Sequence, residues 1–167
     1  GYEHNSYGAG YSNTTGSNNV AVGSSALAKN TTASNNTAVG YQAGYNNTTG
    51  TPNTFLGFQA GYANTTGVAG TFIGHTAGVA NTGDANTFVG YQAGYAVAGT
   101  GTVQTGIYNT FIGTSSGNAI TTGAKNTILG RYSGNQGGLN ITTSSNYIVL
   151  SDGDGNPRGY YHAGDAA

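Results

Sequence analysis

Short apolar segments ending in glycine recur along the chain at nearly constant spacing. Each segment has a β-branched, an apolar and an aliphatic residue before the glycine, and the glycines are Gly23, Gly40, Gly57, Gly74, Gly90, Gly113 and Gly130. Successive glycines are 17, 17, 17, 16, 23 and 17 residues apart. The segments are too short for helices and rich in strand-forming residues. The pattern predicts a repetitive β-structure with one coil per repeat of about 17 residues.

Two neighbouring positions of the repeat are apolar in every copy. The aliphatic column, directly before the glycine, contains Val39, Leu56, Ile73, Val89, Ile112 and Leu129. The phenylalanine column, one residue earlier, contains Phe55, Phe72, Phe88 and Phe111. Adjacent residues of a strand point to opposite faces, so both faces of the strand must be covered. We expect one column to fill the coil and the other to lie between copies of the chain.

Glycines recur at two positions of each repeat, four residues apart. Glycine permits the positive φ angles and close backbone approach that sharp corners require, so we expect two short strands per coil. The sequence predicts an all-β fold, a parallel β-solenoid or β-roll of about eight coils over residues 1–150. A degenerate eighth copy places Ile148 in the phenylalanine column and Val149 in the aliphatic column. Residues 151–167 are expected to form a C-terminal cap or linker, and Ala96 to Gly106 a surface loop.

Composition removes several classes of function. Only 5% of the 167 residues are charged and the net charge is −1. The chain therefore lacks the basic surface that binds nucleic acid or an anionic membrane. No apolar run is long enough for membrane insertion. Cysteine is absent, which excludes disulfides and zinc–thiolate sites. The 31 glycines suggest disorder, but 13 tyrosines and 5 phenylalanines argue for stacked repeats instead.

The run NNTAVGYQAGYNNTTG, residues 35–50, carries a family resemblance. It resembles the repeats of bacteriophage tail-fibre proteins and the head repeats of trimeric autotransporter adhesins, and the resemblance extends over residues 6–150. It implies a left-handed β-roll with three chains around one axis. It also implies a structural, non-enzymatic role in host attachment, with the protein in a virion tail fibre or at the cell surface. Residues 146–158 resemble the segment preceding a C-terminal chaperone domain in such fibres.

Two other structural functions remain open. Solenoid ends with unpaired strand edges permit end-to-end stacking into an extracellular filament. An ice-binding solenoid is suggested by a regular threonine column, although these side chains share a face with the aliphatic column and are therefore expected inside. The threonine column consists of Thr37, Thr54, Thr71, Thr87, Thr110 and Thr127.

Candidate catalytic and metal-binding chemistry is sparse. No acid–base pair or nucleophile motif is present, so we predict neither enzymatic activity nor a cofactor. Asp152, Asp154 and Asn156 have the spacing of the first three ligands of a calcium loop. Pro157 stands where such a loop needs glycine, and Ala163 occupies the closing position, which favours an Asx-rich turn.

Tyrosine columns are candidates for contacts with a host-surface glycan, since aromatic faces stack on sugars. Around the expected loop the candidate tyrosines are Tyr91, Tyr95 and Tyr108. Gln104, in the loop itself, is the candidate for hydrogen bonds to a sugar. The alternative, which we favour, is that the tyrosines stack on one another or cover the contact between the chains of a trimer. His75 takes the position held by Tyr41, Phe58 and Tyr91, which suggests a surface variant rather than a ligand.

Overall fold

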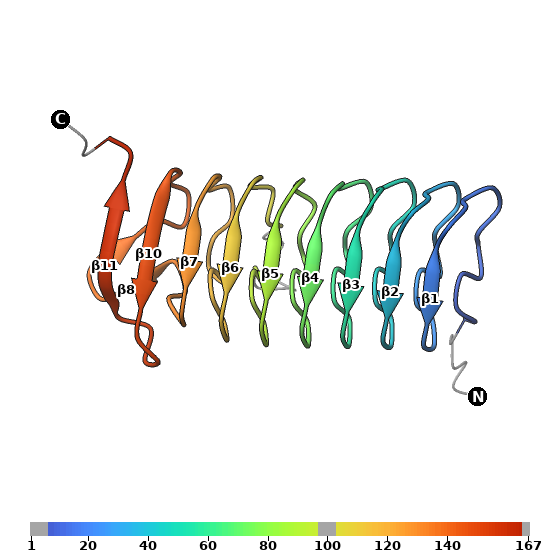
Figure 1. Ribbon diagram of the computed structural model, residues 1–167, viewed down its shortest axis with the longest axis horizontal. Helices are drawn as coiled ribbons and strands as arrows, with labels where there is room; N and C mark the ends of the chain where they lie inside the picture. Colours follow the sequence, from blue (N-terminus) through green and yellow to red (C-terminus); the bar gives the residue numbers. More distant parts are fainter. Residues whose placement is uncertain (1–6, 97–102, 165–167) are drawn as a thin grey trace.

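The chain forms a parallel β-solenoid of about seven turns. The computed structural model describes residues 7–96 and 103–164, in which every regular element is a strand. The coils stack along one long axis, and the N- and C-terminal coils lie at opposite ends of the rod (Figure 1). The repeated strands are β1 (Val20–Val22), β2 (Thr37–Val39), β3 (Thr54–Leu56), β4 (Thr71–Ile73), β5 (Thr87–Val89), β6 (Thr110–Ile112) and β7 (Thr127–Leu129).

Equivalent residues of successive coils pair in register. Thr54 pairs with Thr71, Phe55 with Phe72 and Leu56 with Ile73, and β1 to β7 continue into β10 (Tyr147–Ser151) as parallel neighbours. The predicted parallel β-solenoid is therefore confirmed. The expectation of two strands per coil is wrong, because the remaining legs are successive tight turns. Their amides still bond to the next coil, as in the 2.9 Å bond from Gly44 N to Ala60 O.

The phenylalanine column fills the interior. Phe55, Phe72, Phe88 and Phe111 are fully buried, and neighbouring rings lie 5.8, 5.1 and 5.0 Å apart between centroids. The opposite wall is built from small residues. A Cβ on Gly78, for example, would lie 2.9 Å from the Phe72 ring. The coil is thus wide enough for one aromatic ring per turn only because glycine and alanine face it.

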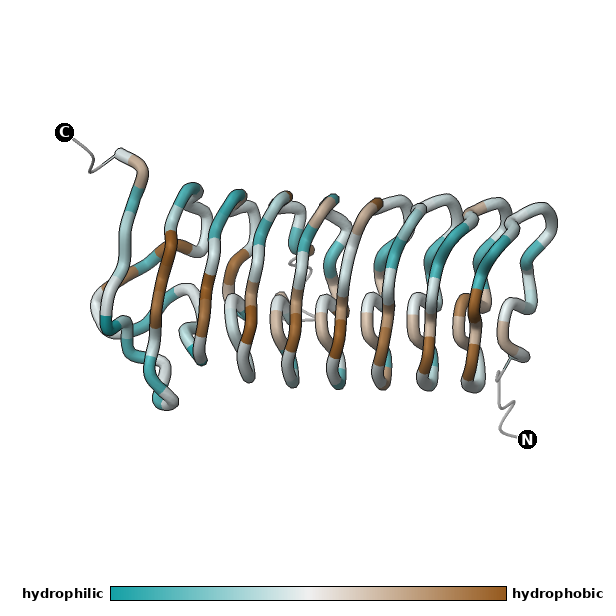
Figure 2. Tube along the Cα trace, viewed as in Figure 1, coloured by the Kyte–Doolittle hydropathy of each residue, from teal (hydrophilic) through white to brown (hydrophobic). Residues whose placement is uncertain are grey.

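The aliphatic and threonine columns together form the outer sheet face, which this single chain leaves uncovered. Leu56 is 44% exposed, Ile112 41% and Leu129 42%, while the threonines of β2 to β7 are exposed or half-buried. Figure 2 shows the apolar strand segments as a band repeated along the rod. The threonine column does share a face with the aliphatic column, but its expected position inside is wrong, since the phenylalanines occupy the interior.

Asparagines at the start of the strands form a second internal feature. Such an asparagine accepts a backbone N–H from the next coil, as from Asn126 N to Asn109 Oδ1 at 2.9 Å. Its amide nitrogen also donates to a turn carbonyl, as from Asn109 Nδ2 to Gly123 O at 2.9 Å. We call this set the asparagine ladder: Asn19, Asn53, Asn86, Asn109 and Asn126. It satisfies buried backbone groups that the strands themselves do not pair.

The C-terminal end departs from the repeat. A small hairpin, β8 (Asn135–Gln136) and β9 (Leu139–Asn140), precedes β10, and β11 (Pro157–His162) then pairs antiparallel with β10. Residues 157–162 therefore belong to the sheet as its last strand.

The register predicted for the eighth copy is wrong by one residue. Val149 pairs with Ile128 and is fully buried, so it continues the phenylalanine column, and Leu150 continues the aliphatic column. Ile148 pairs with Thr127 on the outer face. The β8–β9 hairpin lengthens this coil, so the spacing of about 17 residues could not be used to align the eighth copy with the others.

Candidate functional site

An exposed aromatic ladder runs beside the outer sheet face, around the glycine corner from the aliphatic column. It consists of Tyr41, Phe58, His75 and Tyr91, whose ring centroids are 5.4, 4.8 and 5.3 Å apart with interplanar angles of 18, 12 and 21°. Tyr41 is 45% exposed and Tyr91 50%. The expected stacking of tyrosines on one another is confirmed for Tyr45 and Tyr62, at 5.2 Å. In the exposed ladder the tyrosines stack on Phe58 and His75 instead.

Stacking limits what the aromatic ladder can bind. A sugar needs a free ring face, but the faces inside the ladder are covered by the neighbouring rings, which leaves their edges exposed. Only the two ends of the ladder have an outward face. At the Tyr91 end the next residue in the column is Thr114, as the 2.7 Å bond from Ser115 N to Tyr91 O shows. Threonine is too small to cover a tyrosine ring.

The residues predicted to form a glycan platform do not come together. Tyr95 is half-buried against Val79 and Ala96, and Tyr108, although 59% exposed, precedes β6 whereas Tyr91 follows β5. Tyr91 and Tyr108 therefore lie at opposite ends of the strands.

Gln104 is fully buried, so the expectation that its amide reaches a surface ligand is wrong. Its backbone bridges to Asn81, which places it inside the coil in line with other buried asparagines. The middle of the expected loop, residues 97–102, lies outside the described residues. Of the described residues beside it, Ala96 and Gln104 are buried, whereas Val103 is 43% exposed.

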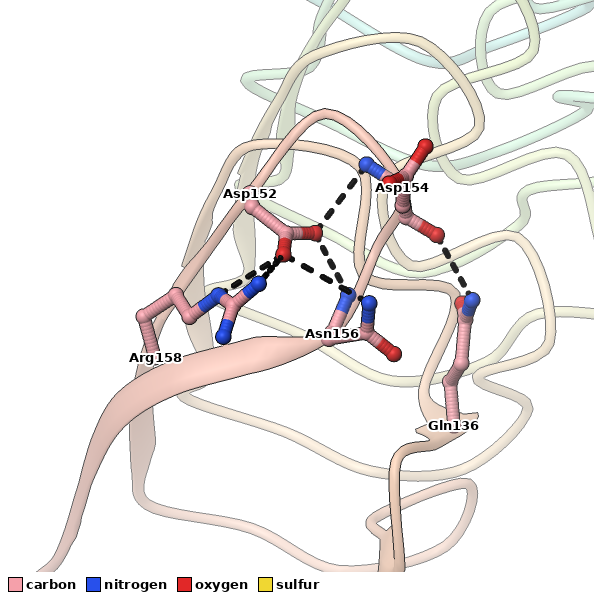
Figure 3. Close-up of polar contacts among 5 residues, drawn as sticks. All are labelled: Gln136, Asp152, Asp154, Asn156 and Arg158. Carbon is pink, nitrogen blue, oxygen red and sulfur yellow. Dashed lines mark hydrogen bonds and ion pairs between the residues drawn. The ribbon is translucent and has the colours of Figure 1, made fainter.

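Asp152 organises the turn between β10 and β11 (Figure 3). Its carboxylate accepts the backbone N–H groups of Asp154 at 3.0 Å and Asn156 at 2.9 Å, and it pairs with the Arg158 guanidinium, whose Nε lies 2.7 Å away. The backbone hydrogen bond from Asn156 is the main cause that lowers the pKa of Asp152, and Arg158 lowers it further.

This cluster has the hydrogen bonds of an Asx turn closed by an arginine, the arrangement favoured from the sequence. The Asp152 oxygens that would face calcium already accept hydrogen bonds or lie against a positive charge. No group of three or more His, Cys, Asp or Glu side chains that could hold a metal ion occurs within residues 7–96 and 103–164.

An open depression continues the line of the aromatic ladder toward the C-terminal end. Thr114, Arg131 and Asp152 line it together with Gly113, Gly130 and Ser151. Gly113 and Gly130 have φ angles of 136° and 109°, and a Cβ on Gly113 would collide with the Gly130 carbonyl. Close coil stacking at this corner thus excludes side chains, and the floor of the depression is backbone. Thr114 and Arg131 were not identified as candidate site residues from the sequence. The available signal was their position directly after a repeat glycine, which places them in the same column as Tyr91.

Tyr132 is the largest buried polar side chain near this end of the rod. Its hydroxyl donates to Leu139 O at 2.8 Å, which attaches the β8–β9 hairpin to the core. Burial, and secondarily the nearby Tyr147, raise the pKa of Tyr132 to about 12.

Comparison with known proteins finds no family model, no curated protein and no solved structure that matches the chain. Within the part of the chain that the structure describes, there is no helix of the length and apolarity needed to span a membrane. A function must therefore be inferred from the fold and from the surfaces that the fold exposes.

Proposed function

We propose that this chain is the shaft of a homotrimeric, non-enzymatic attachment fibre, with the outer sheet face of each chain turned toward the common axis. The observation that carries the proposal is the uncovered aliphatic column on that face. Contiguous apolar surface of this kind marks an interaction site in soluble proteins. Strands β1 to β7 contain no charged residue that would oppose burial of the face.

A second copy of the chain is the occupant that fits this face best. The aliphatic side chains repeat once per coil along the rod, so only a partner with the same coil spacing matches every step. Parallel copies around a rotation axis provide such a partner and form a closed assembly. The number three rests on the resemblance of the repeats to those of tail fibres and trimeric adhesins.

Light scattering, combined with electron microscopy, tests the proposal. We expect short rods of trimeric mass, and we expect Leu56→Asp combined with Ile112→Asp to convert them to monomers. Thr66→Asp, on an exposed turn, is the matched control and should leave the trimer intact. Monomeric wild-type protein would refute the proposal.

End-to-end stacking into filaments is less favoured by the arrangement of the C-terminal end. There β11 runs antiparallel to the other strands of the sheet, so another copy cannot continue the parallel pairing at that edge. Indefinite filaments in the same micrographs would favour this alternative.

Ice binding gains support from one observation, the position of the threonine column on the outer sheet face. The threonines are regularly spaced and accessible in the single chain. A trimer axis and an ice surface would occupy the same face, so the two functions exclude each other. Thermal hysteresis from a monomer, lost in Thr71→Lys, would support ice binding.

A further inference from the structure

We propose that the depression beyond Tyr91 binds an acidic saccharide, with the sugar ring on the free face of Tyr91 and its carboxylate on Arg131. The inference deepens the proposed function, on which it rests in part, because it identifies what an attachment fibre would recognise. It also moves the candidate glycan site away from the loop predicted from sequence. The site lies around the glycine corner from the outer sheet face.

The column that contains Tyr91 changes character along the rod. From Tyr41 to Tyr91 the column is aromatic, and it continues as Thr114, Arg131 and Asp152 in the next three coils. Tyr91 has His75 against one face at 5.3 Å, and its other face looks over Thr114. The arrangement joins an apolar ring to hydrogen-bonding groups, as carbohydrate sites require.

Hydrogen-bond donors in the depression remain free. Arg131 is exposed and makes one long bond, 3.5 Å from Nη1 to Gly153 O, so most of its donors are available. The Ser151 hydroxyl accepts from Tyr132 N at 2.9 Å and donates to Leu129 O at 3.4 Å, so its hydrogen bonds are made within the chain. Arg131 therefore supplies the free donors of the depression, which needs a ligand rich in acceptors.

The charge of the depression selects an acidic ligand. The Asp152 carboxylate is paired with Arg158 and two backbone N–H groups, so it does not neutralise Arg131. Among the residues that line the depression, Arg131 is then the only group with an uncompensated charge. A guanidinium binds carboxylates through paired hydrogen bonds, which selects an acidic over a neutral sugar.

The length of the site suits a short oligosaccharide. Tyr91 and Asp152 are separated by three coil steps, roughly 14 Å at the spacing of paired strands. A short oligosaccharide lying along the rod could span this distance without bending, and the backbone floor at Gly113 and Gly130 leaves room for it.

The test uses titration calorimetry of the full chain at low salt with a tetramer of galacturonic acid and a tetrasaccharide of alternating glucuronic acid and N-acetylglucosamine. Neutral chitotetraose and inorganic phosphate are the comparison probes. We expect at least one acidic tetrasaccharide to bind, and Arg131→Gln and Tyr91→Ala each to weaken it about tenfold or more. Tyr108→Ala is the control and should bind as wild type, since Tyr108 is also exposed, at 59% against 50% for Tyr91, but lies at the opposite end of the strands.

Several results would overturn the inference. These are absence of binding by both acidic tetrasaccharides, equal binding of chitotetraose, or binding unchanged by either variant. Phosphate binding as tight as that of the saccharides would mean a simple anion site. Light scattering on the same samples separates this test from the proposed function, because a trimer without saccharide binding overturns only the site and a saccharide-binding monomer overturns only the assembly.

Discussion

Phe72→Ala tests whether the interior column holds the solenoid together. Phe72 is fully buried between Phe55, at 5.8 Å, and Phe88, at 5.1 Å, and glycine already lines the opposite wall. The surrounding coils are fixed by their backbone pairing and cannot collapse onto the space left by the ring. Removing a buried phenylalanine costs about 3–5 kcal/mol of unfolding free energy. For a chain of this size, that lowers the melting temperature by roughly 6–20 °C.

Circular dichroism during thermal and urea unfolding measures the loss, and the neighbouring residue provides the control. Ile73→Ala removes an apolar side chain of similar size from the half-exposed outer sheet face. The loss of unfolding free energy caused by Ile73→Ala should be small in a monomeric chain. It should increase with protein concentration if copies associate through that face. A cost below about 1 kcal/mol for Phe72→Ala would refute the reasoning, because removal of a fully buried ring always destabilises a rigid interior by more than that.

Three further predictions concern other parts of the rod. Asn109→Ala leaves the Asn126 N–H and the Gly123 carbonyl without partners and should cost about 2–5 kcal/mol in urea unfolding; a cost equal to that of the exposed Asn135→Ala would contradict the asparagine ladder. Deletion of residues 41–57, one whole coil, should leave a folded, shorter rod with an unchanged type of circular dichroism spectrum, whereas an unfolded product would show that coils are not interchangeable. Because the folded-state pKa of Tyr132 is raised from 10.0 to about 12, its contribution to stability is complete below pH 10 and is lost between pH 10 and about 12. Tyr132→Phe should weaken that alkaline decline, and an identical pH profile in the variant would show that another group causes it.

The solenoid could be predicted because each coil repeats the same sequence motif. A single segment such as TFIG is ambiguous, but seven aligned copies reveal two apolar columns and their strand spacing. The same alignment could not say which column faces inward, since both are apolar throughout. Size decides it in the structure: the phenylalanine rings fill a coil whose other wall is glycine and alanine, as at Gly78.

The buried polar groups were not predictable in the same way. Asparagine beside threonine has the composition of a turn, and only the three-dimensional pairing shows that Asn109 and Asn126 bond through the interior. Gln104 was assigned to a projecting loop because sequence spacing cannot distinguish an insertion from the coil that resumes after it. The candidate saccharide site depends on Tyr91 and Arg131, which are 40 residues apart. The repeat places both directly after a glycine, but only the structure shows that the column is exposed and lies along an open depression.

The direction of the hydrogen bonds between coils has a mechanical consequence. These bonds run along the rod, and the described N- and C-terminal coils lie at its two ends (Figure 1). A force applied to the ends of one chain therefore loads the coils in series, and the weakest coil opens first rather than all coils sharing the load. Each released coil of about 17 residues would add roughly 50 Å of extended chain after subtraction of its small rise. A single chain under tension would then lengthen in uniform steps, whereas association of several chains along their sheet faces would make each step require rupture of lateral contacts as well.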